Sequence, residues 1–319
     1  MIVLGINAYH GDSSAAIVRD GKLVAAIEEE RLRRIKHWAG LPVESIRYCL
    51  AEAGIKFSQL EHVAINLNPR VNHLKRLLFL LKRRPDVKLI FERLRKLKKT
   101  RSVGEALAEA FPDEPLNAQV HHIEHHLAHI ASSYLCSPFK DAVNLSVDGF
   151  GDFASAAWGM GVDGKIQIDG RVYFPHSLGM FYSALTQYLG FPHFGDEYKV
   201  MGLAPYGRPL FVDKIRNNLI DIKPDGSFRL NMKYFDYCTG LTMTNARFDE
   251  LFGGPPRKPE QELTQYHMDL AASIQVVLEE IVLNLTRSLR IEFGLSKLCL
   301  AGGVALNCVA NGRVLRDKA

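Results

Sequence analysis

The apolar and polar positions of this chain repeat one series of elements twice. In the first half they predict strands over 2–6, 14–18 and 23–27, a helix over 43–53 that ends at Gly54, and a further strand over 62–66. In the second half the same patterns predict strands over 141–148, 153–162 and 165–172 and a helix over 178–189. An Asp-Gly pair, Asp20-Gly21 or Asp163-Gly164, separates the last two strands of each set and is a two-residue hairpin signal. The repeat predicts a duplicated α/β fold.

The segments between these series complete the two halves, which divide at residues 139 and 140. A short strand is predicted over 119–121, followed by a helix that ends near Pro138. The stretch 195–262 is mixed and Gly/Pro-rich, so we expect long connections of the kind that form active-site loops. The second half closes with a long helix, a strand and a final helix, predicted over 263–293, over 297–301 and after Gly302-Gly303.

The composition, 47% hydrophobic and 24% charged, is that of a soluble globular protein. The first apolar run breaks after four positions and predicts a strand rather than a signal peptide, and no run is long enough for a transmembrane helix. The five cysteines lie in apolar contexts without CxxC spacing. We therefore expect buried thiols in a reducing cytoplasm, with no disulfides, no zinc ribbon and no membrane partner.

The net charge of +5 is unevenly distributed. Between Arg70 and Arg101, thirteen Lys and Arg residues accompany two acidic ones, which gives this segment a net charge of +11 and leaves −6 for the rest of the chain. Apolar residues at helical spacing predict two amphipathic helices here, over 74–81 and 89–97, broken near Pro85.

Clustered basic residues on amphipathic helices are compatible with a nucleic-acid-binding or membrane-binding module. Aromatic residues, which would stack on bases, are limited to Phe79 and Phe91 in the basic segment. Charged helix faces are usually just solvated, so we expect a basic helical insertion over about 68–110 and disfavour nucleic acid as a partner.

Five of the twelve histidines lie between His121 and His129, and the apolar run that follows is typical of a helix. On a helix, His125 and His129 are one turn apart on the same face, which is the spacing at which two imidazoles bind one metal ion or, when protonated, one anion. The alternative is a polar helix start in which histidines cap backbone groups. Five clustered histidines are difficult to explain as caps, so both interpretations stay open. His121 and His122 fall at a strand end and are expected to be structural.

Polar, glycine-bearing turns follow the first predicted strand of each half. In the second half the turn is Asp148-Gly149-Phe150-Gly151-Asp152, where glycine lets a phosphate approach the backbone and the aspartates can hold a cation or orient water. In the first half the matching turn contains His10-Gly11-Asp12-Ser13. Asp-Gly turns alone are common in hairpins. Because these two occupy equivalent places in a duplicated fold, we expect them to face one cleft.

Two further segments carry candidate ligand-binding residues. Gly302-Gly303, which Asn307 follows, suits either a nucleotide phosphate at a helix start or a tight strand-to-helix turn, and spacing alone does not separate the two. Lys199 lies where charged residues run into a Gly/Pro loop. It is either a phosphate ligand or a surface lysine, as most lysines are.

Six ordered motifs together resemble the carbamoyltransferase family: GINAYHGDSSAAIV, EEERLRRIKHWAG, HHLAH, LSVDGFGDF, GDEYKVMGLAPYG and LAGGVALN. The resemblance runs from Met1 to about Arg316 and is weakest in the basic segment 70–101. The family contains the nodulation protein NodU and the antibiotic O-carbamoyltransferases. Over this domain it is also similar to the transferase that makes threonylcarbamoyladenosine in tRNA.

The resemblance implies a fold and a metal site. The implied fold is α/β, with duplicated RNase H-like lobes of the actin-like ATPase (ASKHA) type over 1–139 and 140–319, the second lobe being incomplete at its C-terminus. His125 and His129 are implied to bind a metal, usually iron, with Asp148 as the third ligand and a fourth, an aspartate, beyond the last residue. Two imidazoles and a carboxylate suit Fe²⁺, Mn²⁺ or Zn²⁺. His126 points away from the ligand face and is expected to be buried or to support a ligand.

The implied reaction moves a carbamoyl group from carbamoyl-adenylate, made from carbamoyl phosphate and ATP, to a hydroxyl of a small-molecule or sugar acceptor. The turn residues Gly11 to Ser13, Gly149, Gly151 and Asp152, together with Gly302, Gly303 and Asn307, are then expected to hold the nucleotide. The catalytic candidates are Lys199, Lys36 and His10, and Lys199 or the Lys36-His37 pair could meet its phosphate or carbamoyl end. The YrdC-like domain that usually makes the adenylate is absent from these residues, so we expect this chain alone not to activate carbamoyl phosphate.

Two other enzyme classes stay open. One is a tRNA threonylcarbamoyl transferase-like enzyme, and the other is an actin-like-fold sugar or acetate kinase, which shares the phosphate turns but has no need of the paired histidines. A tightly bound transition metal would separate the kinase from the transferases. The expected partners are ATP, carbamoyl phosphate, the hydroxyl acceptor, the YrdC-like domain and a second copy of the chain in a homodimer.

Overall fold

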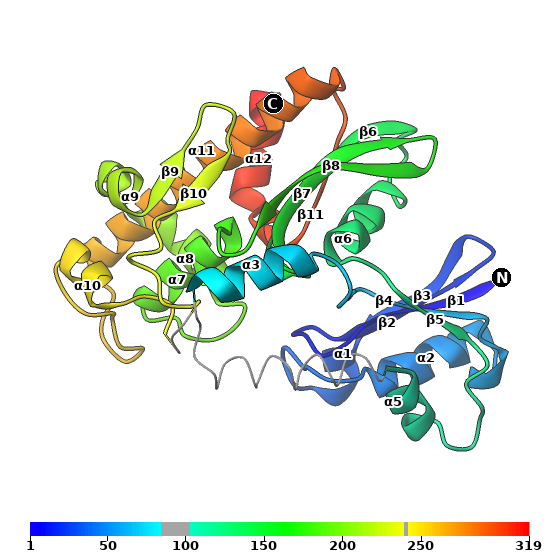
Figure 1. Ribbon diagram of the computed structural model, residues 1–319. Helices are drawn as coiled ribbons and strands as arrows, with labels where there is room; N and C mark the ends of the chain where they lie inside the picture. Colours follow the sequence, from blue (N-terminus) through cyan, green and yellow to red (C-terminus); the bar gives the residue numbers. More distant parts are fainter. Residues whose placement is uncertain (84–102, 239–241, 319) are drawn as a thin grey trace. The chain divides into compact units, whose positions relative to one another are not determined.

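The computed structural model describes residues 1–83, 103–238 and 242–318, and these form two compact units (Figure 1). Unit 1 comprises the described residues of Met1–His73 and Val87–Ala128. Unit 2 comprises those of Leu74–Asp86 and His129–Ala319. The division therefore falls inside helix α6 (His125–Tyr134), whereas the boundary expected from the sequence lies after residue 139.

Unit 1 contains a five-stranded sheet in the order β3-β2-β1-β4-β5. Its strands are β1 (Ile2–Asn7), β2 (Ser14–Arg19), β3 (Lys22–Glu28), β4 (His62–Ile65) and β5 (Gln119–His122). The first three form an antiparallel meander in which Val3 pairs with Val18, and β4 lies parallel to β1 with His62 opposite Val3. The left-handed conformations of Asp20 and Gly21, at φ 51° and 78°, make the predicted two-residue hairpin between β2 and β3.

The helices of unit 1 cover one face of this sheet. They are α1 (Glu29–Arg33), α2 (Val43–Ala53), the 3-10 turn η1 (Phe57–Gln59) and α5 (Val103–Ala110). Alternate residues of β1, such as Leu4 and Ile6, are buried, and the apolar stripe of α2, including Ile46 and Leu50, packs in the same core. Helix α2 ends where Gly54 adopts φ 62°, as the sequence predicts.

Unit 2 contains a four-stranded sheet in the order β11-β6-β7-β8 and a small two-stranded sheet. The four strands are β6 (Asp141–Gly151), β7 (Ala154–Val162), β8 (Lys165–Tyr173) and β11 (Leu298–Ala301), and the small sheet consists of β9 (Ile220–Ile222) and β10 (Phe228–Leu230). Strand β6 is antiparallel to β7 and parallel to β11, with Val143 opposite Leu298.

The helices of unit 2 enclose its main hydrophobic core. They are α3 (His73–Arg83), α7 (Leu178–Tyr188), α8 (Glu197–Leu203), η2 (Ala204–Tyr206), α9 (Val212–Asn218), α10 (Ala246–Phe252), α11 (Gln265–Phe293), η3 (Gly303–Leu306) and α12 (Cys308–Asp317). Buried residues of β6 such as Leu145 share this core with Phe181 of α7 and Ile274 of α11. Within the described residues, no helix is long and apolar enough to cross a bilayer.

The strand orders confirm the predicted fold class. In both units a three-stranded antiparallel meander is extended, from its first strand, by a parallel strand that comes much later in the chain. This duplicated arrangement is the RNase H-like one that an actin-like α/β fold contains. In each unit helices follow the meander before the parallel strand, and in unit 2 the β9–β10 pair is inserted among them.

Several finer predictions are wrong. Strand β6 continues to Gly151, so the expected turn at residues 148–152 is reduced to Asp152 and Phe153, both at positive φ. The stretch 195–262 also contains short helices and the β9–β10 pair between its connections, because apolar residues such as Phe235 and Phe248 are buried in the core. Of the cysteines expected to be buried, Cys136 and Cys308 are exposed.

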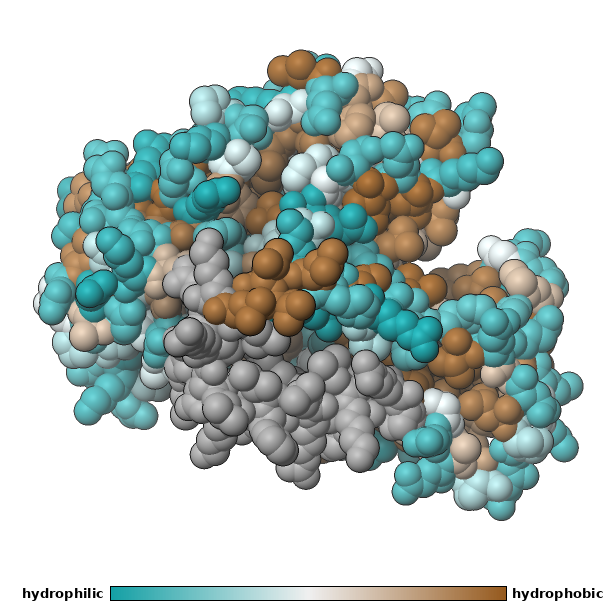
Figure 2. Space-filling view, viewed as in Figure 1, coloured by the Kyte–Doolittle hydropathy of each residue, from teal (hydrophilic) through white to brown (hydrophobic). Residues whose placement is uncertain are grey.

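Helix α3, the first helix of the basic insertion, packs on unit 2. Phe79 is buried, with its ring centroid 5.8 Å from that of Phe153 and 4.7 Å from that of Phe174. Arg76 lies 3.7 Å from Asp152. The predicted apolar stripe of this helix is exposed and forms the brown patch over α3 in Figure 2. It consists of Leu74, Leu77, Leu78 and Leu81. The helix predicted over 89–97 lies outside the described residues.

Candidate metal centre

Helix α6 presents two histidines one turn apart. It begins at His125, and the carboxylate of Glu124 accepts the backbone N–H of Leu127 at 2.8 Å, which satisfies a donor at the helix start. His125 is buried, and its Nδ1 lies 3.3 Å from the carbonyl oxygen of Asn66. A carbonyl partner for Nδ1 sets the tautomer that leaves Nε2 as the metal-binding atom, as in many metal sites.

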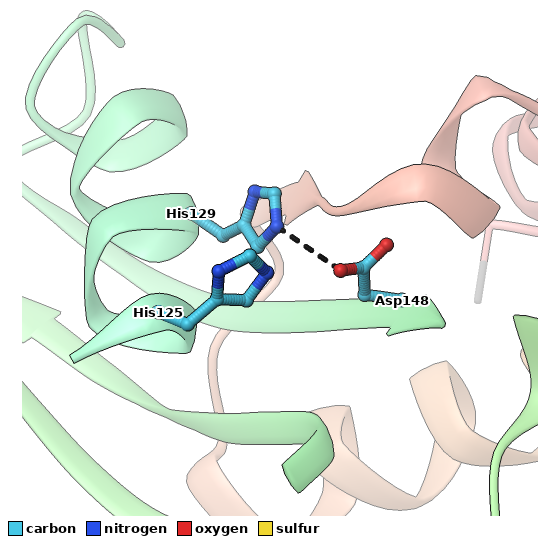
Figure 3. Close-up of side chains that lie close together, drawn as sticks. All are labelled: His125, His129 and Asp148. Carbon is cyan, nitrogen blue, oxygen red and sulfur yellow. Dashed lines mark ion pairs between the residues drawn. The ribbon is translucent and has the colours of Figure 1, made fainter. Parts of the chain in front are cut away.

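Strand β6 presents Asp148 to the same place. The Ser177 hydroxyl donates to the carbonyl oxygens of Asp148 and Gly149, at 3.0 and 2.8 Å, and so fixes the backbone here. The backbone N–H of Gly303 donates to Asp148 Oδ1 at 2.9 Å. The other carboxylate oxygen, Oδ2, lies 3.4 Å from His129 Nε2 (Figure 3).

His125, His129 and Asp148 form one candidate ligand group. Their ligand atoms all lie within 4.8 Å of one another, and Figure 3 shows both imidazoles beside the Asp148 carboxylate. Two ligands of a tetrahedral ion with bonds near 2.1 Å are about 3.4 Å apart. The His129–Asp148 pair already has this separation. Two nitrogens and one carboxylate oxygen suit Fe²⁺, Mn²⁺ or Zn²⁺ better than Ca²⁺ or Mg²⁺, so the donor set fits a transition metal.

The other histidines of the cluster have partners elsewhere. His126 is fully buried, with its ring edge-on to that of His125 at a centroid distance of 5.4 Å. His121 Nε2 lies 3.0 Å from His62 Nδ1 on the neighbouring strand, and His122 Nδ1 lies 3.0 Å from the carbonyl oxygen of Leu67. These contacts are those of residues that support the sheet and the start of α6.

The glycines after β11 have a role that the sequence did not reveal. Gly302 adopts φ 92°, and a Cβ there would meet the Val147 carbonyl oxygen at 2.3 Å. A Cβ on Gly303 would meet Asp148 Oδ1 at 2.8 Å. Position 302 therefore requires glycine so that the turn can approach β6, and a larger residue at 303 would displace the Asp148 carboxylate. The turn is followed by η3, not directly by an α-helix as expected.

Asn307, a predicted nucleotide-binding residue, is turned into unit 2. Its Oδ1 accepts the backbone N–H of Ala310 at 3.0 Å and so caps α12. Its Nδ2 donates to Gln275 of α11 at 2.9 Å, and Gln275 also accepts the Tyr182 hydroxyl at 3.0 Å. This buried network fixes the start of α12, which a spacing argument cannot detect.

The predicted residues of the other two turns lie in different surroundings. Ser13 is fully buried, and its hydroxyl donates to the carbonyl oxygens of His10 and Gly40, both at 3.0 Å. Gly11 lies in the same turn, half-buried.

In the turn after β6, Asp152 is buried against Arg76 of α3. Burial lowers the pKa of the Arg76 guanidinium, and the charge of Asp152 opposes this effect. Gly149 and Gly151 belong to the end of β6.

The two lysines among the predicted catalytic residues lie in different units. Lys199 lies on α8, not in a loop, and its Nζ lies 2.6 Å from Asp196 Oδ1. The hydrogen bond to Asp196 raises the pKa of Lys199; burial pushes the pKa of Asp196 upwards, but the bonds from Lys199 and the His193 N–H outweigh it and keep that pKa low. Lys36 is exposed in the loop after α1.

His10 and a pair that the sequence did not reveal lie in unit 1. The His10 ring centroid is 6.0 Å from that of His125. Asp12 Oδ1 lies 2.8 Å from Nδ1 of His37. The sequence places His37 beside Lys36 as a candidate for the phosphate or carbamoyl end, but it gives no signal for the pairing with Asp12.

A family profile and several curated relatives match nearly the whole of this chain. The profile of the family described as "Carbamoyltransferase N-terminus" matches residues 2–319. The uncharacterised protein sll1178 of Synechocystis is 46% identical over 99% of this chain and 52% of its own length. The nodulation protein NolNO of Sinorhizobium fredii is 36% identical over 98% of this chain and 43% of its own length. The chain therefore spans about half the length of these relatives.

Solved structures match at low similarity. Component A of the (R)-2-hydroxyglutaryl-CoA dehydratase of Acidaminococcus fermentans matches with a TM-score of 0.46 and 11% identity, over 99% of this chain and 88% of that one. HypF of T. kodakarensis matches with a TM-score of 0.42 and 14% identity, over 99% of this chain and 43% of that one. The strand orders of the two sheets show the fold, and the profile and the relatives show the family. The chain belongs to the carbamoyltransferase family and corresponds to its N-terminal domain.

Proposed function

We propose that this chain is the transferase part of an O-carbamoyltransferase, which moves a carbamoyl group from carbamoyl-adenylate to a hydroxyl of a small-molecule or sugar acceptor. The observation that carries the proposal is the His125, His129 and Asp148 group in a chain of the carbamoyltransferase family. A kinase of similar fold would need phosphate-binding turns but no such transition-metal ligand set.

The three ligands would hold Fe²⁺, or Mn²⁺ or Zn²⁺ in its place. A bound metal would act as a Lewis acid and template for the carbamoyl or phosphate oxygens. The protein's own part is to hold the ligands: the Asn66 carbonyl orients His125, and the Gly303 N–H and the Ser177 hydroxyl hold Asp148 and its backbone. Such supporting bonds commonly set metal affinity.

The nucleotide is proposed to lie against the glycine-bearing segments that include Gly11, Gly149 and Gly302. Small residues there let a phosphate approach backbone N–H groups. Asp12, Ser13, Gly151, Asp152, Gly303 and Asn307 would shape these segments rather than contact the phosphate, since the structure gives Ser13, Asp152 and Asn307 partners within the protein.

His10 is the best-placed candidate for contact with the carbamoyl end, because its ring lies beside that of His125. In this proposal Lys36 and Lys199 supply positive charge near the phosphate. The ion pair with Asp196 reduces the net positive charge that Lys199 offers to a phosphate, so we rank Lys36 above it.

The acceptor is proposed to be a hydroxylated sugar or similar metabolite, because a relative of this chain is a nodulation protein. Formation of the adenylate from ATP and carbamoyl phosphate is proposed to need a YrdC-like domain. Since this chain spans about half the length of its relatives, that activity would lie in the other half.

The test uses the full-length protein with ATP, carbamoyl phosphate and a panel of hydroxyl acceptors: chitotetraose, kanamycin and glycerol. We expect AMP, pyrophosphate and an acceptor heavier by one carbamoyl group, detected by mass spectrometry. ADP with a phosphorylated acceptor would identify a kinase instead. Carbamoylation that required threonine and tRNA would identify the threonylcarbamoyl transferase class.

A further inference from the structure

Asp12 and His37 form a carboxylate–imidazole pair in unit 1. Asp12 Oδ1 lies 2.8 Å from His37 Nδ1, and the backbone N–H of His37 donates to Glu30 Oε2 at 2.9 Å. A carboxylate on one ring nitrogen fixes the tautomer and stabilises the imidazolium, which prepares the other nitrogen, Nε2, to accept a proton. The side chains are 38% exposed for His37 and 44% for Asp12, so a small molecule can reach the pair.

The loops that carry the pair are tightly joined. The backbone N–H of Ser13 donates to the Trp38 carbonyl at 3.0 Å, and the N–H of Tyr9 donates to the Gly40 carbonyl at 3.1 Å. Asp12 and His37 both adopt left-handed backbone conformations, at φ 61° and 53°. Non-glycine residues keep such conformations only where the surrounding structure enforces them, and this is common at active sites.

The turn that carries Asp12 also carries His10, whose ring lies 6.0 Å from the ring of His125, centroid to centroid. One short turn of unit 1 therefore runs from the first histidine of the candidate metal group to the Asp12–His37 pair. A hydroxyl bound near His37 would therefore lie on the same turn as a group that contacts His10 beside His125.

Asp12 and His37 also form, with Glu30, a group whose ligand atoms lie within 4.8 Å of one another. Two features favour proton transfer over metal binding here. Both carboxylates already contact His37, one through its ring and the other through its backbone N–H. Four of the six residues between Glu30 and His37 are Arg or Lys, and this positive charge opposes binding of a further cation.

We propose that His37, oriented by Asp12, is the general base that takes the proton from the acceptor hydroxyl, a role that rests on the carbamoyl transfer proposed above. The hydroxyl oxygen forms a bond to the carbamoyl carbon, and the hydroxyl proton passes to His37 Nε2. The bond from that carbon to the phosphate oxygen breaks, its electron pair leaves with AMP, and the imidazolium returns its proton to solvent. Asp12 is the positioning residue that holds the His37 ring and fixes its tautomer.

The test compares two nucleophiles in the full-length protein supplied with ATP and carbamoyl phosphate. Hydroxylamine attacks an activated carbamoyl group without a general base and gives hydroxyurea, whereas the hydroxyls of the acceptor panel need one. For H37N we expect hydroxyurea formation at the wild-type rate and a fall of about 100-fold in kcat for the hydroxyl acceptor, with little change in its KM.

A second measurement is rescue by imidazole. Added imidazole should partly restore acceptor carbamoylation by H37A, which a purely structural defect would not allow. D12N should show the same pattern with a smaller fall of about tenfold.

Matched controls are H73N and D20N, which alter an exposed histidine and an exposed aspartate of unit 1 and should leave both products unchanged. O-carbamoylation by H37N at the wild-type rate would overturn the role of His37 while leaving the proposed function intact. Hydroxyurea with no O-carbamoyl product in the wild-type protein would overturn the proposed function itself. If H37N and E30Q each bound one metal ion fewer than the wild type, His37 would be a metal ligand and not a general base.

Discussion

His129 Nε2 lies 3.4 Å from Asp148 Oδ2, although the two residues belong to different elements, α6 and β6. Asp148 Oδ1 is held at the same time by the backbone N–H of Gly303. The carboxylate is thus oriented towards the histidine before any ligand binds, and such preorganisation lowers the cost of forming a metal site.

The first prediction concerns the ligand set. H129N and D148N should each reduce the affinity for Fe²⁺ or Co²⁺ by about 100-fold or more, since loss of a supporting partner alone costs up to that amount. The measurement is an anaerobic titration of the purified chain followed by Co²⁺ absorption and metal analysis.

The matched control for these variants is H121N, which alters another histidine of the same cluster. His121 pairs with His62 and lies outside the candidate group, so this variant should keep the metal affinity within about threefold. Equal loss of metal in all three variants would contradict the assignment of His129 and Asp148 as ligands.

The second prediction concerns the glycine that holds the carboxylate. In G303A the added Cβ would meet Asp148 Oδ1 at 2.8 Å and push the carboxylate away from the Gly303 N–H. We expect the metal affinity to fall about tenfold, as for other changes next to a ligand. G254A is the control, because a Cβ there meets nothing within 4 Å; the Co²⁺ titration compares the two.

The third prediction is a pH dependence of stability from Glu29, a buried carboxylate of α1. Burial pushes its pKa upwards, but hydrogen bonds from Arg33, Ser45 and Glu44 outweigh this and hold the pKa below the ordinary value of 4.5. A pKa lowered by folding stabilises the protein above the unfolded-state pKa, and this stabilisation is lost as the pH falls through the folded-state pKa.

The matching experiment is urea unfolding of E29Q and the wild type at pH 7 and near pH 3. At pH 7, E29Q should be less stable by about 3 kcal/mol, because it removes the buried carboxylate of the 2.6 Å ion pair with Arg33. The difference should shrink at the lower pH, where Glu29 becomes protonated in the wild type. E52Q, which alters an exposed glutamate of α2, should match the wild type at both pH values.

The fourth prediction concerns the docking of α3 on unit 2. Phe79 is buried between Phe153 and Phe174, so F79A should lower the free energy of unfolding by about 3 kcal/mol. L78A changes the preceding residue on the same helix, which is 61% exposed, and should cost about 0.5 kcal/mol or less. Equal effects of the two variants in urea unfolding would show that α3 does not pack through Phe79.

Local sequence was enough to predict the elements and the pairing of two ligands. Period-2 and period-3.6 patterns placed the strands and helices, and Asp20-Gly21 and Asp163-Gly164 marked hairpins because only a few residues tolerate left-handed backbone there. The spacing of His125 and His129 placed both on one face of α6, since helix geometry is local. These features depend on neighbours within a few residues, which a sequence displays directly.

The surroundings of those residues follow from the tertiary structure alone. Gly303 and Asp148 are 155 residues apart, and their hydrogen bond exists because β11 pairs with β6 in parallel. The Asp12–His37 pair depends on two loops that backbone bonds join across 25 residues. The stretch 195–262 resembles loops in its Gly and Pro content, yet parts of it form short helices, because aromatic residues such as Phe235 and Phe248 are buried in the core of unit 2. Burial and long-range pairing are properties of the whole fold, so local spacing carries no signal for them.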